Sequence, residues 1–188
     1  MKRYVNNNKG LSLLELLAAV AISAFILASI YGVLLSGIKA YKQIGIENQL
    51  RSEADYVVAT VMNQLYQFAP DGIDMTATTD QHLAFVNNKQ KVINPSVGWV
   101  EEQETAKQTL DIELQNDALF INGGKMSSDQ LQIISNQSKL SYSCVQKEGN
   151  MCYSGIVTFV LAVQDRDHAK PNDVLYIKPF VLKTEFGF

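Results

Sequence analysis

One carboxylate stands inside an otherwise uncharged apolar stretch near the start of the 188-residue sequence. Between Leu11 and Ile38 there are 28 residues, of which 21 are apolar, and Glu15 is the only charged one. Placing a carboxylate in a hydrocarbon environment costs free energy, and such a group usually has a partner that compensates its charge. Glu15 is therefore the first candidate for a functional residue, and the chemistry that it needs is a cation supplied from elsewhere.

Two cysteines form the second candidate group. Cys144 and Cys152 enclose seven residues with a Glu-Gly-Asn turn in the middle. On the outer side of a membrane they would close this loop as a disulfide, which in the chain-entropy model stabilises the fold by roughly 2–3 kcal/mol. In a reducing compartment they would remain two partly buried thiols. A metal site would need more ligands, and His82 and His168 are far away in sequence, so we expect a disulfide and no metal.

The most acid-dense loop runs from Asp165 to Asp173. A solvated turn between two strands is one interpretation, and a calcium site is the other. The EF-hand spacing is absent, and Arg166 and Lys170 offset the acidic charge, so the sequence favours the turn.

Nothing else in the sequence indicates catalysis. Neither Gly-x-Ser-x-Gly nor His-Glu-x-x-His occurs, and Gly123-Gly124 is a turn and not a phosphate loop. We expect Trp99, with Val97 and Val100, to lie in the core and not on a binding surface. The prediction is a protein that is not an enzyme and has no cofactor.

The apolar stretch has the length of a membrane-spanning helix. From Leu16 to Ile38 the chain has 23 uncharged residues, and a helix needs about 20 to cross the hydrocarbon core. Lys2, Arg3 and Lys9 precede it, which favours a cytoplasmic N-terminus and an outward C-terminal part. We expect a single-pass protein of the cytoplasmic membrane. A cleaved secretory signal would explain the basic start but not the length, and a plain anchor would not explain Glu15.

Gly10 is followed by Leu-Ser-Leu-Leu-Glu and a long apolar helix, which resembles the class III signal of type IV prepilins and pseudopilins. The resemblance implies that a membrane peptidase cuts between Gly10 and Leu11 and that Leu11 becomes a methylated N-terminus. It also implies that Glu15 pairs with the N-terminal amine of a neighbouring subunit in a filament. Implied partners are other pilin subunits, the prepilin peptidase and methyltransferase, and an inner-membrane assembly platform.

Two departures from the family pattern favour a minor subunit. The first mature residue would be Leu11 where the family prefers Phe, and Gly32 stands where major subunits often carry a helix-bending Pro. The resemblance suggests a minor pilin or pseudopilin that could initiate or cap a cell-surface filament, with DNA uptake as one process it could serve. The formal charge of −3 and the lack of a basic cluster make any nucleic-acid contact indirect. The alternative is a membrane-anchored extracellular binding domain that never assembles.

The helix is expected to continue beyond the membrane segment. Apolar residues at three- and four-residue steps form one stripe, namely Leu50, Ala54, Val57, Val58, Val61, Leu65 and Phe68. Pro70-Asp71-Gly72 ends this pattern. The stripe should cover a sheet of its own domain.

Alternation of apolar and polar residues predicts that sheet downstream. The expected strands are 82–87, 110–114, 118–121, 131–134, 138–143, 156–163 and 174–183, with a hairpin turn at Asn122-Gly123-Gly124 and Pro179 at an edge or a bulge. A long helix followed by an antiparallel sheet is the α+β class and a pilin-like arrangement. We expect a leader (1–10), a transmembrane and filament-core helix (11–38), its amphipathic continuation (39–69) and an extracytoplasmic β-rich domain (70–188).

Overall fold

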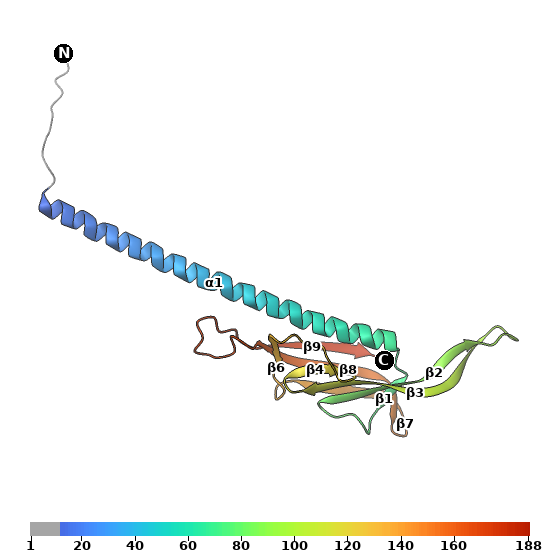
Figure 1. Cartoon of the computed structure of the whole chain (residues 1–188). Helices are drawn as coiled ribbons and strands as arrows, with labels where there is room; N and C mark the ends of the chain where they lie inside the picture. The colour runs from blue at the N-terminus through green and yellow to red at the C-terminus, as the bar shows by residue number, and fades with distance from the viewer. Residues whose placement is uncertain (1–11) are drawn as a thin grey trace, which may run out of the picture. The chain divides into compact units, whose positions relative to one another are not determined.

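The computed structural model describes residues 12–188. It has one helix, α1 (Leu13–Phe68), followed by an antiparallel sheet (Figure 1). The strands are β1 (Gly72–Asp74), β2 (His82–Ile93), β3 (Val100–Gln115), β4 (Ala118–Ile121), β5 (Gly124–Lys125), β6 (Leu131–Ile133), β7 (Lys139–Glu148), β8 (Met151–Asp165) and β9 (Phe180–Gly187). The α+β, pilin-like fold predicted from the sequence is confirmed.

The chain divides into two compact units between Lys42 and Gln43, within α1. In the first unit, every side chain from Ser12 to Lys42 is exposed. This segment contains an 18-residue window with a mean hydropathy of 2.4, so it is long and apolar enough to cross a membrane.

In the second unit, the rest of α1 covers the sheet with the predicted stripe. Its buried residues are Leu50, Ala54, Val57, Val61 and Leu65. They join one core with β-strand residues such as Phe85, Ile112 and Phe159. Val58 and Phe68, which the stripe also predicted, pack against this core while only partly buried.

The end of α1 is built by residues 68–72. The Ala69 amide donates to the Leu65 carbonyl at 3.0 Å, and Ala69 itself takes a left-handed conformation with φ of 47°. Pro70 follows, so the helix stops there. The Asn87 side-chain amide donates to the carbonyls of Phe68 (2.8 Å) and Ala69 (3.0 Å), which satisfies groups that a helix end leaves open.

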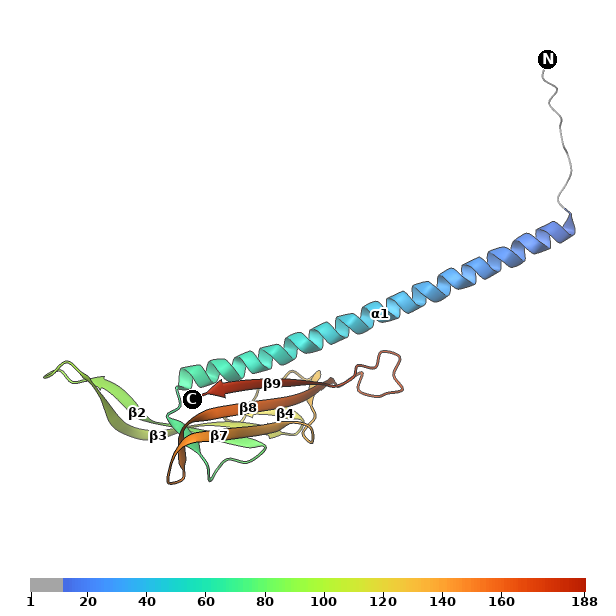
Figure 2. The ribbon, with the colours of Figure 1, turned by 180° about the vertical axis from the view of Figure 1, so that it is seen from behind.

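Strand β8 is the centre of the sheet. It pairs with β7 along one side and with β9 along the other, and these three strands lie side by side in Figure 2. Strand β1 also pairs with β8 and joins it to β2, from which the order continues to β3, β4 and β5. The turn between β4 and β5 is the predicted hairpin: Ile121 pairs with Gly124, and Asn122 and Gly123 have φ of 48° and 77°.

One predicted strand is wrong over half its length. Residues 174–179 form a loop, and β9 begins at Phe180, directly after Pro179. The loop's amides are used locally: Leu175 donates to the Asp173 carboxylate, and Ile177 donates to the His168 carbonyl. A strand needs these amides for its neighbour, so the alternating pattern from Val174 onward does not produce pairing.

Candidate functional site

The predicted assembly residue, Glu15, lies in the first turn of α1. Its Oε2 accepts hydrogen bonds from the backbone amide of Ser12 at 2.9 Å and from the Ser12 hydroxyl at 3.2 Å. The Glu15 amide donates back to Ser12 Oγ at 3.3 Å. This reciprocal pair is a capping box, and it places the carboxylate at the positive end of the helix.

The sequence interpretation missed Ser12. The signal was available, because Ser-Leu-Leu-Glu before an apolar run is the pattern of a capping box. Gly10 and Leu11, the predicted processing residues, lie outside the described residues. Their role stays a prediction.

Exposed apolar side chains of α1 lie on both sides of Glu15 in the sequence. Leu13, Leu16 and Phe25 are among them, and all residues through Lys42 are exposed within their unit. Soluble proteins rarely leave so much contiguous apolar surface uncovered. Lipid or other apolar helices are therefore the expected cover.

The two cysteines are joined. A disulfide links Cys144 on β7 with Cys152 on β8, next to a hairpin turn in which Glu148 pairs with Met151. The paired state predicted from the sequence is confirmed by the structure. The pairing of β7 with β8 shifts register on both sides of Gln146, so the covalent bond holds the strands together where their ladder is irregular.

The acidic loop is organised by its own residues. One oxygen of Asp165 accepts hydrogen bonds from the amides of Asp167 (3.0 Å) and His168 (2.9 Å) and lies 2.7 Å from Nδ1 of His168. Within residues 12–188, no group of three or more His, Cys, Asp or Glu side chains is placed to hold a metal ion. The contacts are those of a self-contained turn.

The prediction that Trp99 lies in the core is wrong. Trp99 and Val100 are each 61% exposed and Val97 is 57% exposed. They lie at the end of a two-stranded extension of β2 and β3, residues 89–107, which we call the arm (Figure 1). No helix or third strand pairs with the arm in the described structure, so its apolar residues have no second layer to pack against.

The orientation of Trp99 is fixed by polar contacts. Its indole Nε1 donates to Glu101 Oε1 at 2.8 Å, and the Asn94 side-chain amide donates to the same oxygen at 2.8 Å. These hydrogen bonds stabilise the charged carboxylate and lower the pKa of Glu101, with the Trp99 bond as the larger cause.

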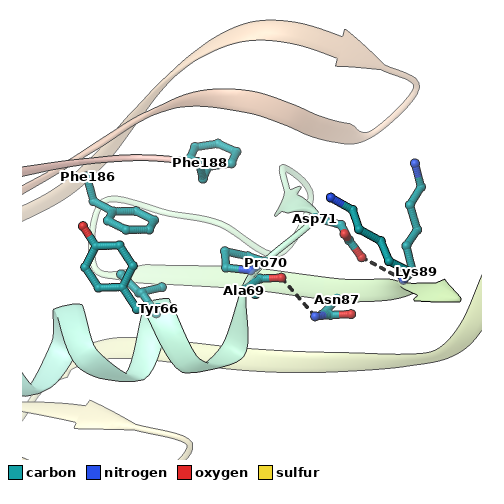
Figure 3. A pocket seen from close by; sticks show the side chains of 10 residues that line it. Tyr66, Ala69, Pro70, Asp71, Asn87, Lys89, Phe186 and Phe188 are labelled. Atoms are coloured by element: carbon teal, nitrogen blue, oxygen red, sulfur yellow. Dashed lines mark hydrogen bonds between the residues drawn. The ribbon is translucent and has the colours of Figure 1, made fainter. Parts of the chain in front are cut away.

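A pocket of about 510 Å³ opens where the end of α1 meets β2 and β9 (Figure 3). Its wall is aromatic: the rings of Tyr66 and Phe186 meet edge to face at 5.4 Å, and Phe188 lies on the other side of Phe186. Lys89 and Lys91 line its rim. The sequence interpretation missed this pocket, because its aromatic residues are about 120 positions apart and no local pattern brings them together.

Asp71 lies at the edge of the pocket and fixes the start of the arm. Its Oδ2 accepts hydrogen bonds from the backbone amides of Asn88 and Lys89, both at 2.8 Å. Figure 3 draws the bond to Lys89. The pairing of β2 with β3 shifts register between Asn87 and Lys89. The carboxylate therefore takes the amides that a β-bulge leaves free of the ladder.

Comparison with known proteins identifies the N-terminal segment. Residues 5–31 match the prokaryotic N-terminal methylation motif, which is the type IV pilin signal. No curated protein and no solved structure matches the chain.

The motif at residues 5–31 and the apolar helix support a type IV pilin-like protein, for which a prepilin peptidase would be the processing enzyme. The motif indicates a structural subunit, and it implies pilin subunits and the peptidase as partners. A membrane-anchored state agrees with both the motif and the exposed apolar helix.

Proposed function

We propose that this chain is a minor pilin or pseudopilin, a subunit that assembles into a pilus-like filament and could initiate or cap it. The observation that carries the proposal is the methylation motif at residues 5–31, followed by a helix whose apolar surface the chain leaves exposed. Cleavage between Gly10 and Leu11 would leave residues 11–38 as the segment that lies first in the membrane and then in the filament core. The extracytoplasmic part would be residues 70–188, with 39–69 as the helical connection.

Glu15 would set the register between subunits. In a medium of low dielectric constant, its charged carboxylate is stable only when a cation or hydrogen-bond donors compensate the charge. Ser12 supplies such donors within the chain. The methylated amine at Leu11 of a neighbouring subunit would supply the cation, and a subunit out of register would leave that carboxylate without its charge partner.

The mature N-terminus tests the processing step. Intact-mass and N-terminal analysis of the protein from membranes should give an N-methylated chain that starts at Leu11. An intact Met1 start would instead support an anchored domain that does not assemble. A start near Phe25 would indicate a secretory signal.

The Glu15→Ala variant tests the assembly step. We expect normal processing and membrane insertion but loss of the chain from sheared filaments. Ser12→Ala is the matched control, because it removes the two hydrogen bonds of the Ser12 hydroxyl and keeps the carboxylate, so it should still enter filaments. If Glu15→Ala enters filaments as the wild type does, the register role is wrong.

The process that such a filament serves is also part of the proposal. DNA uptake is the first candidate, and secretion and motility are the others. A deletion strain assayed for transformation, secretion and twitching side by side would separate them. Loss of transformation alone would support DNA uptake, with any nucleic-acid contact indirect.

A further inference from the structure

The end of the arm is an exposed apolar surface with acidic neighbours. Ile93, Val97, Trp99 and Val100 are all more than half exposed, and we call them the arm tip. Its carboxylates are Glu101 and Glu102. Glu102 is ion-paired with Lys89 of its own chain at 3.2 Å and lies across from Lys91, whereas Glu101 forms no ion pair within residues 12–188. A partner for this tip should therefore present an apolar pocket with positive charge beside it.

The arm tip is arranged for binding before any partner arrives. Glu101 holds the indole of Trp99, and Asn94 holds Glu101. A side chain that is already fixed loses less conformational freedom when it binds. A central tryptophan surrounded by smaller apolar residues is the composition typical of a binding hot spot.

The pocket beside the end of α1 has the complementary properties. Its wall is formed by Tyr66, Phe186 and Phe188, and aromatic rings pack well against an indole. Its volume of about 510 Å³ lies within the range of sites that bind organic groups of this size. Two lysines line the rim. Lys89 is ion-paired with Glu102 of its own chain at 3.2 Å, whereas Lys91 forms no hydrogen bond or ion pair within residues 12–188, so the charge of Lys91 is available to a partner.

The arm cannot fill the pocket of its own chain. The tip lies six residues beyond Asn87 on β2, which corresponds to about 20 Å of extended strand. Figure 1 shows that the arm leads away from the rest of the sheet, whereas the pocket lies at its base. A tip and a pocket that fit each other are thus kept apart within one molecule.

We propose that the arm tip of one copy docks into the Tyr66–Phe188 pocket of a second copy of this chain. The indole of Trp99 packs against the aromatic wall of the pocket, and Glu101 and Glu102 approach Lys91 at the rim. Because the tip and the pocket are different surfaces, the contact is heterologous, so each copy has both a tip to donate and a pocket to accept one. The proposal goes beyond the proposed function, because it assigns a contact to the β-sheet unit that does not involve Glu15.

A photo-crosslinking amino acid at Val97 tests the contact in the full-length chain in its native membrane. Two copies with different tags are co-expressed, and only one of them carries the probe. We expect a crosslinked dimer of the two tags, with the probe attached to the peptide around Tyr66 or around Phe186. A probe at Val145 on β7 is the control: this valine is more exposed than Val97 (81% against 57%), yet it should not label these peptides.

Variants then test which groups make the contact. Trp99→Ala in the probe copy should lower the yield of dimer about tenfold, as expected for a central hot-spot residue. Glu102→Lys in the probe copy or Lys91→Glu in the acceptor copy should each lower it about threefold. The two charge changes together should restore it, which misfolding of either copy would not do.

Several outcomes would overturn the proposal. The first is that no crosslinked dimer forms, and the second is a crosslink only to lipid or to a different protein. The third is a dimer yield that does not change with Trp99→Ala. The mature mass of the chain is measured in the same samples. Loss of the tip contact with a normal Leu11 start would reject this inference and leave the proposed function untouched.

Discussion

The two parts of α1 on either side of Lys42 use apolar residues in opposite ways. From Leu13 to Lys42 the apolar residues surround the helix and all are exposed. From Gln43 to Phe68 they form one stripe, and five of them are buried against the sheet. Both parts are continuous helix, so the difference teaches that the distribution of side chains around a helix, and not helix formation, determines what covers it.

The β2–β3 hairpin shows the same contrast within the sheet. Its inner part contributes Leu83, Phe85, Leu110 and Ile112 to the core. Its outer part, the arm, carries Trp99 and Val100 without cover. In both the helix and the hairpin, one part buries its apolar side chains within the chain, and the other part leaves them exposed to lipid or to another protein.

The largest effect should follow from a cavity in the self-covered part of α1. Leu65 is 0% exposed, and Leu65→Ala should lower the free energy of unfolding by about 3 kcal/mol, because it removes buried contacts and leaves a cavity. Urea denaturation of the full chain in detergent micelles, followed by circular dichroism of the sheet, would measure this. Leu27→Ala is the matched control: Leu27 is 63% exposed, so the change should stay within about 0.5 kcal/mol. If Leu65→Ala and Leu27→Ala lowered the free energy of unfolding equally, the two parts of α1 would not differ in what covers them.

An intermediate effect is expected at the junction between the inner sheet and the arm. Asp74 accepts hydrogen bonds from the Thr76 hydroxyl at 2.6 Å and from Lys107 Nζ at 3.0 Å. These bonds lower the pKa of Asp74 from 3.8 to about 2, and the hydrogen bond from Thr76 is the largest cause. A carboxylate whose pKa is lowered by folding stabilises the fold above the unfolded value, and this contribution is lost as the pH falls through the folded value.

Asp74→Asn should therefore destabilise the chain at pH 7 by about 1–2 kcal/mol. The difference from the wild type should persist down to about pH 4 and shrink between about pH 4 and pH 2, where the wild-type carboxylate takes up its proton. Denaturation curves for both proteins at pH 7, 4 and 2.5 would measure it. A difference that grows toward low pH would contradict the assignment.

The smallest effect on stability should come from the arm tip. Trp99→Ala should change the free energy of unfolding by no more than about 0.5 kcal/mol, because the side chain is exposed and has little core contact to lose. The same denaturation experiment measures it, with Phe85→Ala, at a fully buried aromatic residue of the hairpin, as the contrast. A large loss with Trp99→Ala would mean that the tip is part of the core after all.

Much of the fold could be predicted because some patterns allow few structures. The stripe from Leu50 to Leu65 has the period of a helix with one buried face, and Asn122-Gly123 supplies the two positive φ angles that a tight hairpin needs. Cys144 and Cys152 flank a turn, so their pairing follows from a short loop. Each of these signals is local.

Most of the wrong or missing predictions concern residues whose burial depends on neighbours that are distant in the sequence. Trp99 and Val100 have the composition of a core strand, but they are exposed because nothing within residues 12–188 forms a second layer over the arm. The miss at Val174 has a local cause instead: the Asp173 carboxylate accepts a hydrogen bond from the Leu175 amide, two residues away, so the alternating pattern does not form a strand there. The aromatic pocket joins Tyr66 to Phe186 across the whole sheet sequence. Ser12 differs, since its capping pattern was readable and was overlooked.

The contact between Asp71 and the bulge makes the arm a lever. One carboxylate oxygen holds the two amides from which the arm starts, and the tip lies beyond them on a stiff pair of strands. A rotation of about 10° at this point would carry the tip through about 3.5 Å, because the arm is about 20 Å long. The Asp71 contact at the base of the arm therefore sets the direction in which the tip points, although it lies far from the tip. A change at Asp71 would misdirect the arm without altering any residue of the tip.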